Sequence, residues 1–192
     1  MLAYWEDGPD GLTVAAASDR MGVSKPGLYR EFGGEDGLIA ASLERYEEVR
    51  IGPLLAALEV DRPFAESLER LAAWLGAEAD TGEETMPAGC LLAKARTAAR
   101  RPGPETRARL ESMVEGVLAA YTALADRAVR RGETADGLDA GFAGRYLDTM
   151  ITTFLNERAR GVAGALVARQ ARLAFASLAK RSDGHGGPRE AP

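Results

Sequence analysis

A long stripe of apolar side chains in the middle of the chain limits the folds open to it. The stripe runs from Leu110 through Val117 and Tyr121 to Ala128, at the spacing of one face of an α-helix. Gly132 follows, as glycine often does directly after a helix. The pattern predicts a helix over about residues 105–131, whose apolar face has to be buried against other helices.

Helical spacing recurs along most of the remaining chain. It predicts a helix from Pro63 to about residue 75, one that begins after Asp139, and one that follows Gly161 and continues to Lys180 and Arg181. The strict alternation that marks β-strands is not evident anywhere in the sequence. We therefore expect an all-α protein.

Composition excludes several function classes. The 192 residues carry a formal net charge of −5, with one cysteine, Cys90, and one histidine, His185. A Ser-His-Asp or Cys-His mechanism, an internal disulfide and a zinc site are therefore not expected, and Cys90 is interpreted as a packing residue. There is no apolar run of membrane-spanning length, and the start lacks a signal-peptide pattern. We expect a cytoplasmic protein that is not an enzyme and uses no cofactor, metal or membrane partner.

Two short helices are predicted within residues 13–32. Thr13 is the expected N-cap of the first, whose inner positions are Val14, Ala17 and Met21, and Gly22 ends it.

The second helix begins after Ser24 as N-cap, with Pro26 in its first turn, where the missing N–H is harmless. Leu28 and Phe32 are expected to face inward, and Tyr29 outward. Such a pair joined through a glycine is a helix-turn-helix, whose second helix enters the major groove of DNA. The residues expected to contact DNA are Thr13, Ser24, Lys25, Pro26, Gly27, Tyr29 and Arg30.

The stretch "LTVAAASDRMGVSKPGLYREFGGEDGLIAASLERY" resembles the DNA-binding domain of TetR/AcrR-type transcriptional regulators, a likeness that covers residues 3 to about 50. The stretch "AGCLLAKARTAARRPGPETRARLESMVEGVLAAY" is similar to part of the ligand-binding region in one branch of that family. The resemblance implies a nine-helix homodimer that binds double-stranded operator DNA and is released by a small effector, most simply as a repressor. The implied domains are 1–45 for DNA binding, with a shortened first helix, 46–181 for effector binding and dimerisation, and 182–192 as a flexible tail.

Apolar side chains on the predicted helices could line a cavity for a hydrophobic or aromatic effector, or could be plain core. The candidates are Trp74, Met113, Val117, Tyr121, Met150 and Phe154.

Small residues near the end of the chain would let helices of two protomers approach closely. The candidate dimer interface is Phe142, Gly161, Gly164, Leu166, Ala168 and Leu173.

Gly52 and Pro53 interrupt the long helix expected to join the two domains. Proline within a helix removes one backbone hydrogen bond and favours a kink, so this site is a candidate hinge.

Two alternatives remain open. Residues 1–40 hold three basic and seven acidic side chains, a net charge of −4, and Glu35 stands where the family usually has a phosphate-binding lysine. Both observations favour a TetR-like dimeric ligand-binding or interaction module with weakened or lost DNA binding. The other alternative is a helical enzyme that uses carboxylates such as Glu78, Glu83 or Asp148.

Overall fold

The structure, a computed structural model, describes residues 1–77, 87–98 and 101–180. Within these ranges it contains helices and no β-strand, apart from one isolated bridge between Thr134 and Ala179. The all-α prediction is confirmed. The elements are α1 Leu2–Asp7, α2 Val14–Met21, α3 Lys25–Phe32, α4 Glu35–Tyr46, the π-helix η1 Glu47–Ile51, α5 Gly52–Glu59, α6 Phe64–Gly76, α7 Leu91–Arg96, α8 Pro104–Arg131, α9 Ala140–Ala159 and α10 Gly164–Ala176.

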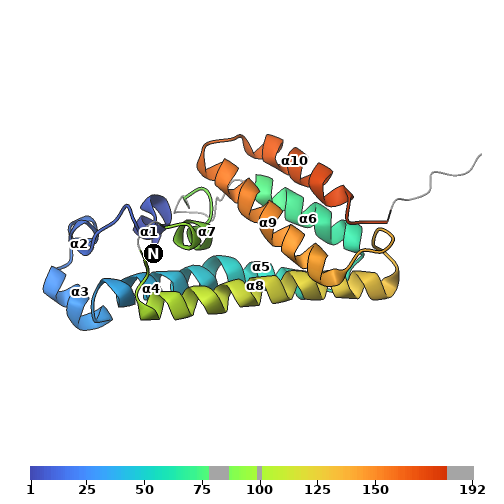
Figure 1. Cartoon of the computed structure of the whole chain (residues 1–192). Coiled ribbons are helices and arrows are strands. Elements are labelled where there is room, and N and C mark those ends of the chain that lie inside the picture. The colour runs from blue at the N-terminus through green and yellow to red at the C-terminus, as the bar shows by residue number, and fades with distance from the viewer. Residues whose placement is uncertain (78–86, 99–100, 181–192) are drawn as a thin grey trace, which may run out of the picture.

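Helices α1 to α3 occupy one end of an elongated molecule (Figure 1). The two predicted N-caps are present: Thr13 Oγ1 accepts from the Ala16 N–H at 3.2 Å, and Ser24 Oγ accepts from the Gly27 N–H at 3.2 Å. The inward position expected for Met21 is wrong, because this side chain is 46% exposed in the last turn of α2.

Elements α4, η1 and α5 form one helical run from Glu35 to Glu59. In η1 the Gly52 N–H bonds to the Glu47 carbonyl, five residues back. Pro53 has no N–H to offer the Val49 carbonyl, which explains why α-helical geometry is lost there. The boundary predicted between residues 45 and 46 falls inside this run, so the two predicted domains share a helix.

Helix α8 runs alongside α4 and α5, and α9 crosses above it with α6 and α10 (Figure 1). Helix α10 ends at Ala176, short of the predicted Lys180. The chain turns there because the Leu178 N–H bonds back to Phe175, and the Lys180 N–H then bonds to the Glu133 carbonyl beside α8. Counted with α4, η1 and α5 as one, the described residues form nine helices, the number that the resemblance implies.

One connected core runs from Trp5 in α1 to Leu178 after α10. It includes the stripe predicted on α8, whose members Leu110, Val117 and Tyr121 are all buried. Helices α1 to α3 and the larger helical body are therefore packed as one unit. None of the helices described combines the length and the apolar character needed to cross a lipid bilayer.

Candidate functional site

Helix α3 presents a polar surface at the end of the molecule. Tyr29 is 47% exposed, and Lys25 and Arg30 are exposed beside it, whereas Leu28 is buried and Phe32 packs against the core. The Lys25 ammonium lies 6.0 Å from the centre of the Tyr29 ring. The outward Tyr29 and inward Phe32 agree with the sequence prediction, and the exposed residues form a compact surface with two cations.

The turn before α3 is held by a residue that sequence reasoning missed. Ser18 is buried at the end of α2; its carbonyl accepts the Val23 N–H at 3.1 Å, and its hydroxyl donates to the Val23 carbonyl. Gly22 adopts a left-handed φ of 64°, which glycine allows without strain. The signal that could have predicted this contact is a serine one turn before the glycine that ends the helix. The result is a rigid spacing between α2 and α3.

Gly27 serves the fold of α3 directly. A Cβ at this position would lie 2.9 Å from Ser24 Oγ, too close for the capping hydrogen bond to persist unchanged. Glycine at position 27 therefore preserves the N-cap as well as leaving the surface of α3 open.

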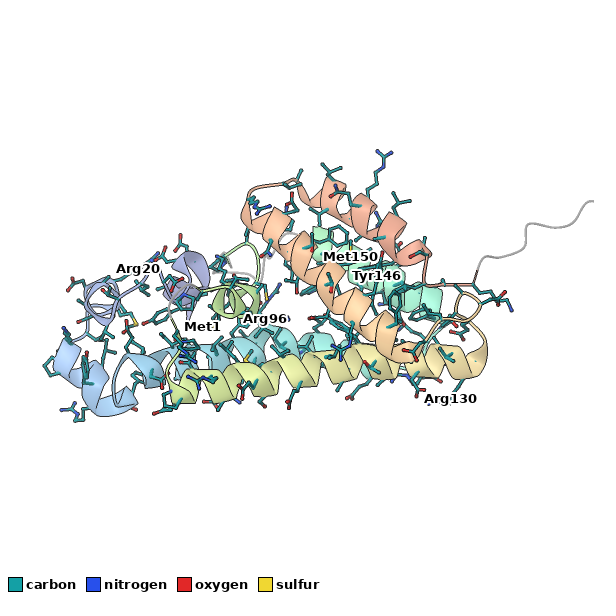
Figure 2. All side chains as sticks on the ribbon, in the orientation of Figure 1. Met1, Arg20, Arg96, Arg130, Tyr146 and Met150 are labelled. Atoms are coloured by element: carbon teal, nitrogen blue, oxygen red, sulfur yellow. The ribbon has the colours of Figure 1, made fainter. Side chains whose placement is uncertain are left out.

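Intramolecular contacts engage several of the seven carboxylates in residues 1–40, among them Glu6, Asp7 and Asp36. Arg20 pairs with Glu6 and, at 2.7 Å, with Asp7, which joins α1 to α2 (Figure 2). The Asp36 carboxylate accepts the N–H groups of Glu105 and Thr106 at the start of α8, at 2.9 and 3.1 Å. The net charge of −4 thus overstates the acidity available to a partner of α3.

Helix α7 holds α1 from the side of the larger body. The Lys94 ammonium donates to the carbonyls of Trp5 and Glu6 at 2.6 and 2.9 Å, and the Trp5 indole N–H donates to the Gly89 carbonyl at 3.3 Å. A cation placed at the C-terminal end of a helix, as Lys94 is at the end of α1, stabilises carbonyls that have no partner within that helix. Six-residue helices are too short for periodicity to reveal, so this contact was not predicted.

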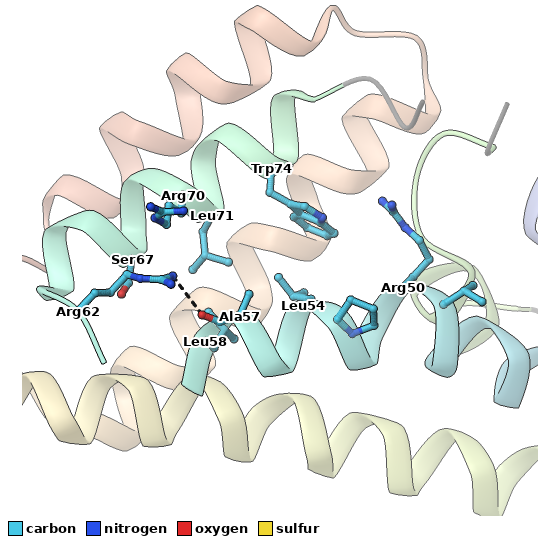
Figure 3. Close-up of a pocket in the computed structure, with 11 residues that line it drawn as sticks. Arg50, Leu54, Ala57, Leu58, Arg62, Ser67, Arg70, Leu71 and Trp74 are labelled. Carbon is cyan, nitrogen blue, oxygen red and sulfur yellow. Dashed lines mark hydrogen bonds between the residues drawn. The ribbon is translucent and has the colours of Figure 1, made fainter. Parts of the chain in front are cut away.

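A cavity of about 190 Å³ lies between α5 and α6 (Figure 3). Its apolar wall is made by Pro53, Leu54, Ala57, Leu58, Leu71 and Trp74. Its polar wall includes Arg50, Arg62, Ser67 and Arg70. A cavity lined by arginines and by apolar side chains suits a ligand that has an apolar body and a negatively charged group.

No family model matches the chain. The HTH-type transcriptional repressor BdcR of Escherichia coli (strain K12) is 35% identical over 67 residues, 35% of this chain and 34% of the relative. The match thus spans about a third of the length of that curated relative.

Solved structures match over almost the whole chain. A TetR family regulator from Agrobacterium tumefaciens superposes with a TM-score of 0.75 at 17% identity, over 92% of both chains. CifR, a TetR family regulator solved with 26-base-pair operator DNA, gives 0.75 at 20% identity over 92% of this chain and 91% of its own. Escherichia coli NemR gives 0.71 at 13% identity over 94% and 93%. The chain has the fold of TetR-family transcriptional regulators.

Within this TetR fold, the residues predicted for DNA contact lie on α3, at its N-cap and at the N-cap of α2, the two helices at one end of the molecule (Figure 1). Thr13 and Ser24 both use their hydroxyls as helix caps, while Pro26 lies in the first turn of α3. A role for these residues in DNA contact remains a prediction.

The six candidate effector residues lie on α6, α8 and α9, and their contact with an effector stays a prediction. Trp74 lines the cavity between α5 and α6. The other five lie on α8 and α9, within the core or packed against it: Met113, Val117, Tyr121, Met150 and Phe154. Figure 2 marks Met150 on α9, beside Tyr146. Burial raises the pKa of Tyr121 well above its usual value, so its phenol stays neutral.

The candidate dimer residues of the TetR fold divide into two groups. Phe142, Leu166 and Leu173 are large apolar side chains that are 59%, 48% and 79% exposed on α9 and α10. Gly161 is exposed, in the turn between those helices. Gly164 and Ala168 instead face α6 of the same chain, because a Cβ on Gly76 would lie 2.6 Å from Ala168 Cβ and 2.7 Å from the Gly164 carbonyl. Their small size serves packing inside the protomer.

Of the carboxylates named for the enzyme alternative, Asp148 alone lies within the described residues. Asp148 pairs with Arg96 at 3.3 Å, and Glu78 and Glu83 lie outside the described residues, as do His185 and the predicted tail 182–192. In the part of the chain that the structure describes, no three His, Cys, Asp or Glu residues are placed to hold a metal ion.

Cys90 is buried and caps α7 through a hydrogen bond from the Ala93 N–H to its sulfur at 3.4 Å. The Tyr46 hydroxyl donates to the same sulfur at 3.3 Å. Burial raises the pKa of both groups, so neither is ionised near neutral pH. This agrees with the packing role expected for Cys90.

Proposed function

We propose that this protein is a ligand-responsive, DNA-binding transcriptional regulator, a homodimer that acts as a repressor and is released from operator DNA by a small effector. The observation that carries the proposal is the exposed surface of α3, formed by Lys25, Tyr29 and Arg30, at the end of a TetR fold. In helix-turn-helix proteins the second helix reads the major groove with its N-terminal residues, while hydroxyls and cations contact phosphates.

The repressor named BdcR and the DNA-bound CifR support the same proposal. Each is evidence about a relative, and the two together favour operator DNA as the partner here. Symmetric dimerisation would present two copies of α3 to successive turns of the major groove, about 34 Å apart.

A second candidate function is a dimeric ligand-binding module that no longer reads DNA. Glu35, in the first turn of α4, favours it, because a carboxylate there repels phosphate. The salt dependence of DNA binding distinguishes the two functions.

The test is binding of the full chain to the DNA beside its own gene, measured by fluorescence anisotropy across a salt series. Two α3 cations per protomer give four in a dimer, so log K should fall against log salt with a slope of about −4.

Lys25→Gln should weaken binding at every sequence and make the slope shallower by about 2 per dimer. Lys180→Gln is the matched control. Lys180 is exposed and follows α10, and its substitution removes the same charge away from α3. No salt-dependent binding by the wild type, or equal effects of the two variants, would favour the ligand-binding module.

A further inference from the structure

We propose that the cavity between α5 and α6 binds a small monocarboxylate with an apolar body, and that Arg50 pairs with its carboxylate. The inference rests on the proposed function in one respect, since it names the effector class of that regulator. The binding step itself needs no DNA.

The three arginines that line the cavity differ in whether another group of the protein already pairs with their positive charge. Arg70 Nε lies 3.0 Å from Glu66, and Arg62 donates to the Ala57 carbonyl at 3.1 Å while its Nε lies 3.9 Å from the same Glu66 (Figure 3). Arg50 makes no ion pair with any residue that the structure describes, and its Nε is buried without a hydrogen-bond partner there. Within the described ranges, Glu66 is thus shared by Arg62 and Arg70, and Arg50 has no carboxylate partner.

The guanidinium of Arg50 lies between two aromatic rings. Its central carbon is 5.5 Å from the Trp5 ring centre and 5.6 Å from the Trp74 ring centre. Cation–π contacts hold a guanidinium in place but leave its N–H donors unsatisfied. A carboxylate can accept two of those donors at once, and such a bidentate pair is the strongest interaction available to arginine.

The remaining wall selects the body of the ligand. Leu54, Leu58, Leu71 and Trp74 are apolar and lie on the two helices that enclose the space. The volume of about 190 Å³ is below the roughly 300–1,000 Å³ typical of sites for drug-sized ligands. An aromatic or medium-chain acid matches this size, and its carboxylate matches Arg50, the one arginine of this cavity without an ion pair among the described residues.

The position of Arg50 connects the cavity to the DNA-proximal helices. Trp74 belongs to α6 and Trp5 to α1, and Arg50 stands between them on η1, the π-helical turn before Pro53. A carboxylate that draws the guanidinium toward the cavity therefore changes its contact with Trp5. An effector bound between α5 and α6 would thereby act on α1.

The chain contains two tryptophans, Trp5 and Trp74, so its intrinsic fluorescence reports on both sides of Arg50. The experiment titrates the DNA-free protein with benzoate and octanoate, and separately with the neutral analogues benzamide and octanamide. We expect saturable binding of at least one acid, with its amide at least roughly tenfold weaker because the charge-assisted hydrogen bonds are lost. Equal affinity for acid and amide, or no saturable binding of either acid, overturns the proposal.

Variants assign the carboxylate contact. Arg50→Gln should lose at least roughly tenfold in affinity for the acid, and Arg50→Lys, which keeps the charge without the planar fork, should lose less. Arg45→Gln is the matched control: Arg45 is one turn earlier on α4 with its side chain 63% exposed, and it should bind like the wild type. An Arg50→Gln variant that melts like the wild type and binds the acid unchanged overturns the assignment.

A final readout isolates the link to α1. In Trp74→Phe the only tryptophan is Trp5, whose emission should change on addition of the acid; an unchanged emission at saturation, shown by calorimetry, overturns the link. Acid binding with no effect on DNA affinity would instead contradict the proposed function and leave the site standing.

Discussion

Asp36 joins the two predicted domains through one carboxylate at the start of α4. It accepts both free N–H groups at the start of α8, and its own carbonyl accepts the Thr106 hydroxyl at 3.1 Å. Burial alone would raise the pKa of Asp36, but these hydrogen bonds from Thr106 and Glu105, with the nearby Arg107 cation, outweigh it, so the pKa is lowered.

Asp36→Asn keeps one acceptor oxygen where Asp36 uses two, so it should reduce the free energy of unfolding at pH 7 by about 1 kcal/mol, the usual scale of one hydrogen bond. Because the folded pKa is below the unfolded one, the stabilisation is present above the unfolded pKa and is lost as pH falls through the folded pKa. Urea unfolding at pH 7 and at progressively lower pH should show the gap between wild type and variant closing. The exposed Asp136→Asn is the control; a gap independent of pH would contradict the role of the charge.

Pro53 leaves the Val49 carbonyl without its helical partner, and the helix widens into η1 just before Pro53. Pro53→Ala restores that N–H and should convert η1 toward an α-helix. We expect a larger change in ligand-induced operator release than in ligand-free stability. Release measured at matched ligand occupancy tests this, with Pro104→Ala, in the first turn of α8, as control. Equal release by wild type and Pro53→Ala would rule out the hinge.

The contact between α6 and α10 depends on two glycines. A Cβ on Gly164 would lie 2.1 Å from the Gly76 carbonyl oxygen, so the backbone of α6 or α10 would have to shift to accommodate it. Gly164→Ala should therefore lower the free energy of unfolding by about 1–3 kcal/mol.

Gly116→Ala on α8, where a new Cβ meets nothing within 4 Å, should raise the free energy of unfolding by about 0.5–1 kcal/mol. Denaturant midpoints compare the two variants, and effects of the same sign would refute this account.

Patterns that repeat along a helix were readable from the sequence, and contacts between distant segments were not. The caps Thr13 and Ser24, the stripe of α8 and the opposed Tyr29 and Phe32 depend on residues within one or two turns. The Arg50 contacts with Trp5 and Trp74 join residues far apart in the chain, and no local sequence pattern predicts such contacts. Gly164 was predicted for the contact between protomers, and only the fold shows that its neighbour is Gly76 of the same chain.

For the whole molecule, the exposed apolar side chains of α9 and α10 are the main unpartnered feature among the described residues. Leu173→Glu should shift the proposed dimer to monomer, because burial of each such side chain contributes about 1.5–3 kcal/mol. Sedimentation velocity measures the change. Val60→Glu, at a 50% exposed valine between α5 and α6, should leave the dimer intact. A wild type that sediments as a monomer would refute this interface.

The glycine contact between α6 and α10 has a consequence for how a dimer would respond to ligand. Helix α6 carries Trp74 in the cavity wall, and α10 carries Leu173 on the exposed face. In the proposed dimer, because the two backbones are in contact, a shift of the cavity wall would move the face that meets the other protomer. Ligand bound in one cavity would then alter the affinity of the second protomer's cavity, and the response to ligand concentration would depart from a single-site hyperbola.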